Sequence, residues 1–139
     1  MAFKITYKPV LEPLPLSGYH PDYGVESLQV CVNPPAELWE EREALLKEQV
    51  DHSEAVLEQI KKAKAEKKQE AIDALNKWAE TVYLPKTNDW FARLWSFGDD
   101  KWTAADLSEI HATDAHLLTW MKNRSIEMVE AHRLARKKN

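Results

Sequence analysis

Two histidines and an aspartate in the C-terminal third have the residue types of a metal site. The segment is His111-Ala-Thr-Asp-Ala-His116. On one helix, side chains five residues apart would point ~140° away from each other, whereas helical zinc motifs place their histidines four apart. Thr113 and Asp114 also have the types that begin a helix, so the histidines fall on either side of a break. We therefore expect a structural or surface role for both histidines and no metal ligand.

Two adjacent aspartates, Asp99 and Asp100, lie between Trp95 and Trp102, where loss of water would raise a carboxyl pKa and suit it to acid–base catalysis. Adjacent aspartates after a glycine are more typical of a solvated turn. A nucleophile is no better supported, since the chain has no Gly-x-Ser-x-Gly and no histidine near Cys31 in sequence. We expect no catalytic residue and no cofactor, so an enzyme is not predicted. A small metal-dependent enzyme is the second alternative.

Basic residues gather in two places, the run Lys61–Lys68 and the tail Arg133–Lys138. Phosphate binding needs a coherent basic face, but the net charge is −4 and acids are interleaved. The run is more typical of a solvated helix face, and the tail of a helix C-terminus, where the dipole favours cations. Nucleic-acid binding is thus not the favoured function. It stays the first alternative, as a small helical phage or host regulatory protein that binds nucleic acid or its machinery.

The composition is that of one domain with an excess of aromatic surface. The 139 residues are 44% hydrophobic and include six tryptophans, three glycines and one cysteine. Such a length suits a single domain, residues 1–139, and three glycines are too few for a glycine-rich phosphate loop. Cys31 has no partner for a disulfide and is predicted to be a small buried side chain. No apolar run approaches the ~18 residues of a membrane span and the start is unlike a signal peptide, so we expect a cytoplasmic protein with no membrane partner.

The first segment, residues 1–35, is predicted to form a β-ribbon with a proline-rich loop. Residues 3–7 and 28–32 alternate apolar and polar side chains, as half-buried strands do. Between Pro9 and Gly24, three further prolines and a second glycine interrupt both kinds of regular structure, which predicts a loop. We expect the two strands to pair and to lean on helices or on another chain.

The second segment, residues 36–82, is predicted to be a long charged helix that begins after Asn33-Pro34-Pro35. Apolar residues recur at spacings of three, four and seven, namely Leu46, Val50, Leu57, Ile60, Ala71, Leu75, Trp78 and Val82. The stripe lapses at Lys61–Lys68, where the chain either continues as helix or turns into an antiparallel hairpin; the lack of glycine and proline favours continuity. Residues 37–58 hold eight acids against two bases, and residues 61–70 five lysines against two glutamates. We expect part of the stripe to remain uncovered.

The third segment, residues 83–139, is predicted to be an aromatic module of three helices. Pro85 is predicted to end the long helix, Asn88 to cap a short helix through Phe97, Thr103 to begin the next in a capping box, and Thr113 to cap the last. The fold class is therefore mainly α, with a short N-terminal β-ribbon, a long amphipathic helix or helical hairpin, and this three-helix module. Large aromatic side chains near loops are typical of binding hot spots. The predicted protein-binding residues are Trp90, Phe91, Leu94, Trp95, Trp102 and Trp120.

The order of parts and several motifs resemble those of the tail assembly chaperones of long-tailed bacteriophages. The stretch Trp90-Phe91-Ala-Arg-Leu94-Trp95-Ser96 is followed by the acidic turn Gly98-Asp99-Asp100, by Trp102-Thr103 opening a helix, and by Leu117-Leu118-Thr-Trp120. Members of this family share an aromatic-x-x-Leu-x-x-Trp helix, an acidic turn and a threonine-capped helix. Two positions depart from that pattern, because Trp95 precedes Ser96 and Lys101-Trp102 stands where the family has Gly-x-Pro.

The resemblance implies a virion assembly protein of the host cytoplasm that is absent from the finished particle. Its partner would be the tape-measure protein, which it would bind and shield before the tail tube polymerises. It also implies a second, longer form made by a ribosomal frameshift. Self-association through the long helix is the other protein contact that we consider, and we expect no nucleic-acid partner.

Overall fold

The computed structural model describes residues 6–138, which group into two compact units. Of the described residues, one unit combines 6–36 with 91–138, and the other is Glu37–Trp90. The first segment and most of the third thus belong to one unit, whereas nearly all of the second segment and residues 83–90 form the other. The predicted mainly helical class with a short N-terminal ribbon is confirmed. Among the described residues, no helix is both long and apolar enough to cross a membrane.

The β-ribbon consists of β1 (Leu11–Pro15) and β2 (Ser27–Cys31), which pair antiparallel with Leu14 opposite Leu28. The second strand agrees with the prediction to within one residue at each end. The first does not, because β1 lies inside the stretch predicted to be a loop. Of the predicted strand at residues 3–7, residues 3–5 lie outside the described part, and the other two are not in a strand.

The prolines of β1 are compatible with pairing because they fall at outward-facing positions. Beyond the two ends of the ladder, Val32 N–H donates to the Val10 carbonyl and Leu16 N–H to the Glu26 carbonyl, both at 2.9 Å. Hydrogen-bonded pairs alternate along an antiparallel ladder, so they fall on the even residues of β1. Pro13 and Pro15 are odd and have no inward N–H to supply, as is usual for proline in an edge strand. The prolines that predicted a loop therefore lie within a strand.

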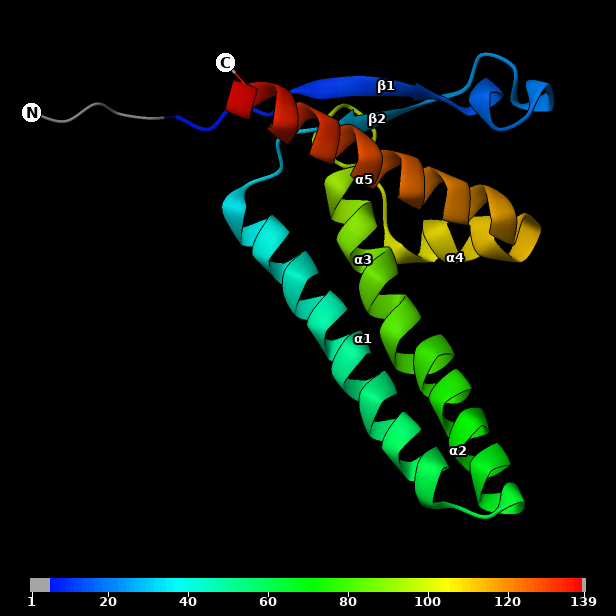
Figure 1. Cartoon of the computed structure of the whole chain (residues 1–139). Helices are drawn as coiled ribbons and strands as arrows, with labels where there is room; N and C mark the ends of the chain where they lie inside the picture. The colour runs from blue at the N-terminus through cyan, green and yellow to red at the C-terminus, as the bar shows by residue number, and fades with distance from the viewer. Residues whose placement is uncertain (1–5, 139) are drawn as a thin grey trace, which may run out of the picture. The chain divides into compact units, whose positions relative to one another are not determined.

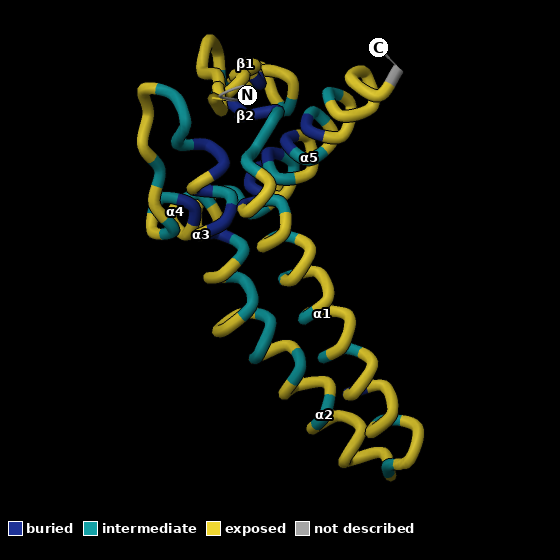
Figure 2. Tube along the Cα trace, turned by 90° about the vertical axis from the view of Figure 1, so that its left-hand side faces the viewer, coloured by how far each residue is buried: buried dark blue, intermediate teal, exposed yellow. Residues whose placement is uncertain are grey.

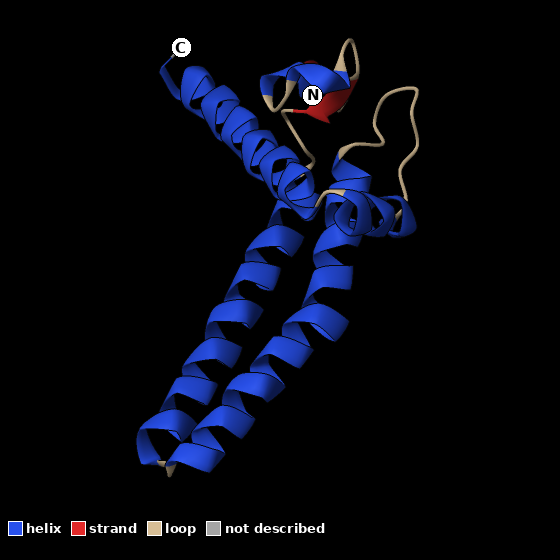
Figure 3. Cartoon of the chain, turned by 90° about the vertical axis from the view of Figure 1, so that its right-hand side faces the viewer, coloured by secondary structure: helices blue, strands red, loops and turns tan. Residues whose placement is uncertain are grey.

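The second unit is built on an antiparallel helical hairpin of α1 (Ala36–Lys62) and α2 (Ala65–Trp78) (Figures 1 and 3). The favoured prediction of one continuous helix is wrong, and the hairpin alternative is right. The chain turns at Ala63 and Lys64, and Lys64 has extended backbone angles (φ −75°, ψ 163°) that any residue adopts. A turn of this kind needs no glycine. It lies where the apolar stripe lapses, so an extended helix would have left both halves of the stripe in water.

Pro85 does not end the helix that follows the turn. The π-helical turn Ala79–Tyr83 continues α2, and α3 (Leu84–Leu94) continues that turn, with Leu84 N–H donating to the Ala79 carbonyl five residues back. Proline disturbs a regular α-helix because its ring meets a carbonyl of the preceding turn. Here it occupies the second position of α3, directly after the wider π turn. Asn88 does not cap a helix, since it lies buried inside α3.

The last two helices are α4 (Ala104–Thr113) and α5 (Ala115–Lys138). The capping box predicted at Thr103 is confirmed, with Thr103 N–H donating to Asp106 Oδ2 at 2.8 Å and Asp106 N–H to Thr103 Oγ1 at 3.3 Å. The cap of α5 is displaced by one residue from the prediction. Asp114, and not Thr113, accepts the Leu117 N–H at 3.0 Å.

The core of the first unit joins β2 to α4 and α5. Its fully buried side chains include Val30, Cys31, Leu107, Met121 and Val129, which confirms the predicted burial of the free cysteine. Figure 2 shows the contrast with the hairpin, where buried residues are few.

One buried polar pair lies within this core. Ser125 Oγ accepts the Trp95 indole N–H at 3.0 Å and donates to the Met121 carbonyl at 2.7 Å, and both side chains are almost completely buried. A buried donor that loses its acceptor retains its desolvation penalty. Position 125 therefore requires a small hydroxyl side chain.

We expect Ser125→Ala to lower the free energy of unfolding by about 1–3 kcal/mol, because the Trp95 N–H is left buried without an acceptor. Urea unfolding followed by tryptophan fluorescence measures the change. The matched control is Ser108→Ala on the exposed face of α4, for which we expect a change within about 0.5 kcal/mol. Equal effects of the two substitutions would contradict the role given to Ser125.

Candidate protein-binding surface

Three of the six predicted binding residues lie in the interior. Trp90, Leu94 and Trp95 are 1%, 0% and 1% exposed. The Trp90 indole N–H donates to the Leu38 carbonyl at 2.7 Å, so this ring fixes α3 to the beginning of α1 within the second unit. These side chains stabilise the two units and present no surface to a partner in this arrangement. Protein binding by the six residues stays a prediction.

Phe91 and Trp102 are half-buried and lie on either side of Trp95. Their ring centroids are 5.5 Å and 5.8 Å from that of Trp95. Lys122 places its Nζ 5.5 Å from the centroid of Phe91, and burial lowers the pKa of this lysine to about 8. Only the outer parts of this aromatic cluster reach solvent.

Trp120, the sixth predicted residue, is covered by the loop between the two strands. The Tyr19 ring lies edge-on at 5.7 Å, and a Cβ at Gly18 would come within 3.3 Å of the indole. Asp114 anchors this loop, because its carboxylate accepts from the hydroxyls of Tyr23 at 2.9 Å and Tyr19 at 3.4 Å. One aspartate thus caps α5 and ties the loop to the beginning of that helix.

The electrostatics of this anchor follow from its hydrogen bonds. The Leu117 N–H and then the Tyr23 hydroxyl stabilise the charged carboxylate and lower the pKa of Asp114. The same hydrogen bond raises the pKa of Tyr23, and loss of water raises that of Tyr19. Each of the three groups therefore keeps its ordinary charge state at neutral pH.

In the hairpin, α1 carries two apolar stripes, whereas the sequence pattern predicted one. The first contains Leu38, Leu45, His52 and Val56, spaced by seven, seven and four residues. This stripe faces α2, since the His52 ring stacks on Trp78 at 4.0 Å and Val56 is buried. Farther along, the Tyr83 hydroxyl donates to Gln49 Oε1 at 3.2 Å. The two helices are thus held by aromatic and polar contacts as well as by apolar ones.

The second stripe contains Leu46, Val50 and Leu57, which are 40%, 51% and 54% exposed. Each of them follows a residue of the inner side by one position, which places it about 100° further around the helix. The spacing of four and seven is that of a heptad seam. We call these three residues the outer stripe. The expectation that part of the predicted stripe remains uncovered agrees with these exposures. The residues of α1 that face α2 are largely not those of the predicted stripe.

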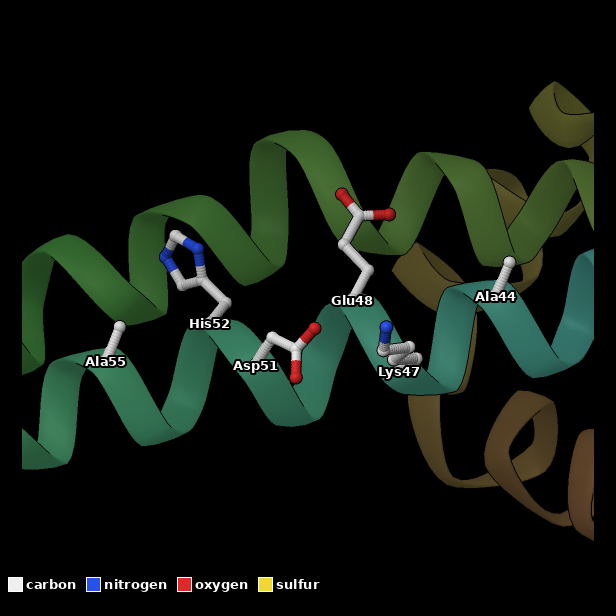
Figure 4. A pocket seen from close by; sticks show the side chains of 6 residues that line it. All are labelled: Ala44, Lys47, Glu48, Asp51, His52 and Ala55. Carbon is white, nitrogen blue, oxygen red and sulfur yellow. The ribbon is translucent and has the colours of Figure 1, made fainter.

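A groove lies on a different side of α1 from the outer stripe. It has a volume of ≈ 540 Å³ and is lined by Ala44, Lys47, Glu48, Asp51, His52 and Ala55 (Figure 4). His52 and Glu48 reach toward the other helical arm, where His52 stacks on Trp78 and Glu48 pairs with Lys86 at 3.0 Å. The groove is open and its lining mixes both signs of charge, so it gives no sign of a specific small ligand.

The structure separates the residues first considered for chemistry. His111 lies in α4 and His116 in α5, and both are exposed, as are Asp99 and Asp100. Within residues 6–138, no three His, Cys, Asp or Glu side chains come together as metal ligands would. No family model matches the chain, and neither curated proteins nor solved structures give a significant match.

We expect Asp114→Asn to lower the midpoint of thermal unfolding at pH 7. A carboxylate with a lowered folded-state pKa adds stability that is fully present above its ordinary pKa of 3.8 and is lost as the pH falls through the folded-state pKa. The difference between wild type and variant should therefore shrink as the pH falls from about 4 to 2. Calorimetry across this range tests it, with Asp100→Asn in the exposed turn as control. A difference that stays constant with pH would contradict the electrostatic anchor.

Lys122 predicts a second pH dependence, in the alkaline range. The unfolded chain keeps the lysine proton up to about pH 10.5, whereas the folded chain releases it at about pH 8, so the free energy of unfolding should rise as the pH increases above 8. Urea unfolding at pH 7, 8 and 9.5 measures this rise, which should be about 1 kcal/mol after allowance for the exposed part of the side chain. It should be absent in Lys122→Met and kept in Lys47→Met. A rise that persists in Lys122→Met would assign the titration to another group.

Proposed function

We propose that this protein binds an apolar helical segment of another protein and shields it from water, in the manner of a phage tail assembly chaperone. The single observation that carries the proposal is the outer stripe of α1. Three large aliphatic side chains at heptad spacing are 40–54% exposed on one line of a 27-residue helix. Exposed apolar side chains that gather on one face are typical of protein interaction sites.

The chemistry of the stripe selects the kind of partner. Leucine and valine at spacings of four and seven fit the apolar seam of another helix, since an amphipathic helix lays such anchors into a complementary stripe. A tape-measure protein is a long helical chain with a stripe of its own that must be kept from aggregation before assembly. It is the client that we propose, on the resemblance of motifs as well as on the stripe.

The charges around the stripe suit temporary binding. Residues 37–58 of α1 hold eight acids against two bases, and the turn of the hairpin is basic. Such charge keeps an exposed stripe soluble and orients a partner without setting the affinity. The buried tryptophans then serve the function indirectly, because Trp90 fixes one end of α1 through the Leu38 carbonyl.

The proposal predicts that Val50→Asp abolishes client binding without unfolding the chain. A carboxylate at the centre of the seam would be desolvated by a bound helix, and we expect the dissociation constant to rise at least tenfold, or about 1.4 kcal/mol. Fluorescence anisotropy of a labelled tape-measure peptide with heptad spacing measures it. The matched control is Ala55→Asp, which adds the same exposed charge beside the groove. Equal affinities of Val50→Asp and wild type would remove the outer stripe as the binding site.

Two further observations separate this function from nucleic-acid binding. Affinity for DNA that falls steeply with rising salt would favour the alternative, since phosphate contacts release counterions. A gene located between those for a major tail protein and a tape-measure protein would support the chaperone.

A further inference from the structure

We infer that, in the absence of a client, the outer stripe is occupied by the α1 helix of a second copy in antiparallel orientation. This inference rests on the proposed function, because it takes the outer stripe to be a helix-binding surface. It adds the identity of a competing occupant and hence a means of regulation. The support comes from the positions of charged residues along the edge of the stripe.

The spacing of the stripe is compatible with a twofold axis. If the axis passes between residues 51 and 52, Leu46 of one copy lies level with Leu57 of the other. Val50 then lies level with Ser53, and a small side chain at this point allows the two helices to approach closely. In this register each leucine of the stripe packs against a leucine of the other copy, and Val50 packs beside the small side chain of Ser53.

The same axis brings opposite charges together along one edge. Glu43 and Lys61 lie on the same side of the stripe, and a twofold axis keeps each on that side in the second copy. Glu43 of one copy and Lys61 of the other then differ in level by one residue, about 1.5 Å along the axis. Lys47 and Glu54 are placed in the same way and differ by two residues. All four side chains are exposed.

A parallel pair lacks these charge pairs. Its twofold axis runs along the helices and places Glu43 of one copy and Lys61 of the other 18 residues apart in level, about 27 Å, on opposite edges of the seam. The two edge pairs therefore form only in the antiparallel arrangement, which they favour.

Self-pairing would protect the exposed leucines until a client displaces the second copy. Client affinity would then depend on protein concentration, because the second copy and the client compete for one surface. The two edge pairs favour orientation more than affinity, so the dimer remains exchangeable.

Charge reversal tests the register. We expect wild type to show a concentration-dependent monomer–dimer equilibrium in sedimentation experiments, and Glu43→Lys or Lys61→Glu alone to raise the dimer dissociation constant about tenfold. The double variant, which restores opposite charges across the twofold axis, should recover dimerisation to near the wild-type level. Glu40→Lys with Lys62→Glu, away from the seam, is the matched control and should leave the equilibrium unchanged. Circular dichroism confirms that each variant is folded.

The outcomes distinguish this inference from the proposed function. A wild-type chain that stays monomeric at all concentrations while still binding a client helix overturns the dimer and leaves the proposed function intact. A dimer that binds no client helix leaves the dimer intact and removes the proposed function. Single reversals that the double variant fails to rescue overturn the antiparallel register.

Discussion

The hairpin depends on a simple geometric constraint, that a single neighbouring helix can cover only one side of α1. The first stripe of α1 is covered by α2 through the His52–Trp78 stack and the buried Val56. The outer stripe lies about 100° further around the same helix and remains in solvent. A unit of two helices leaves one stripe exposed if one of its helices carries two apolar stripes. The exposed surface is thus a direct consequence of pairing this sequence with one helix, and the proposed partners are further helices on the same seam.

The sequence predicted correctly the elements that depend on residues close together in the chain. The capping box at Thr103 depends on residues three apart, and β2 on a short alternating run, and both are found as predicted. The misplaced features depend on contacts between residues distant in sequence. β1 contains two prolines because its partner strand needs no hydrogen bond at those positions, and α1 ends at Lys62 because α2 returns beside it. Neither fact is visible in a window of neighbouring residues.

The candidate surface was harder to predict than the fold, because the residue types that dominate cores also dominate interfaces. Trp90 and Trp95 have the character of binding anchors, yet their indole N–H groups are satisfied internally by the Leu38 carbonyl and Ser125. The aliphatic outer stripe carried a weaker signal in the sequence, since its residues alternate with those of the inner stripe. The two series are offset from each other by one residue. The deciding information is which series α2 covers, and that is a tertiary property.

The π-helical turn at Ala79–Tyr83 bears on how this protein can change during evolution. A turn of this kind holds one residue more than a turn of the α-helix around it, at nearly the same total rotation. Removal of one residue here would leave a regular α-helix with Leu84–Trp90 in nearly the same angular phase. Removal of a residue from the regular helix that follows would instead turn Trp90 by about 100° away from the Leu38 carbonyl. Between Trp78 and Trp90, a change in length by one residue is therefore expected to be tolerated best at Ala79–Tyr83.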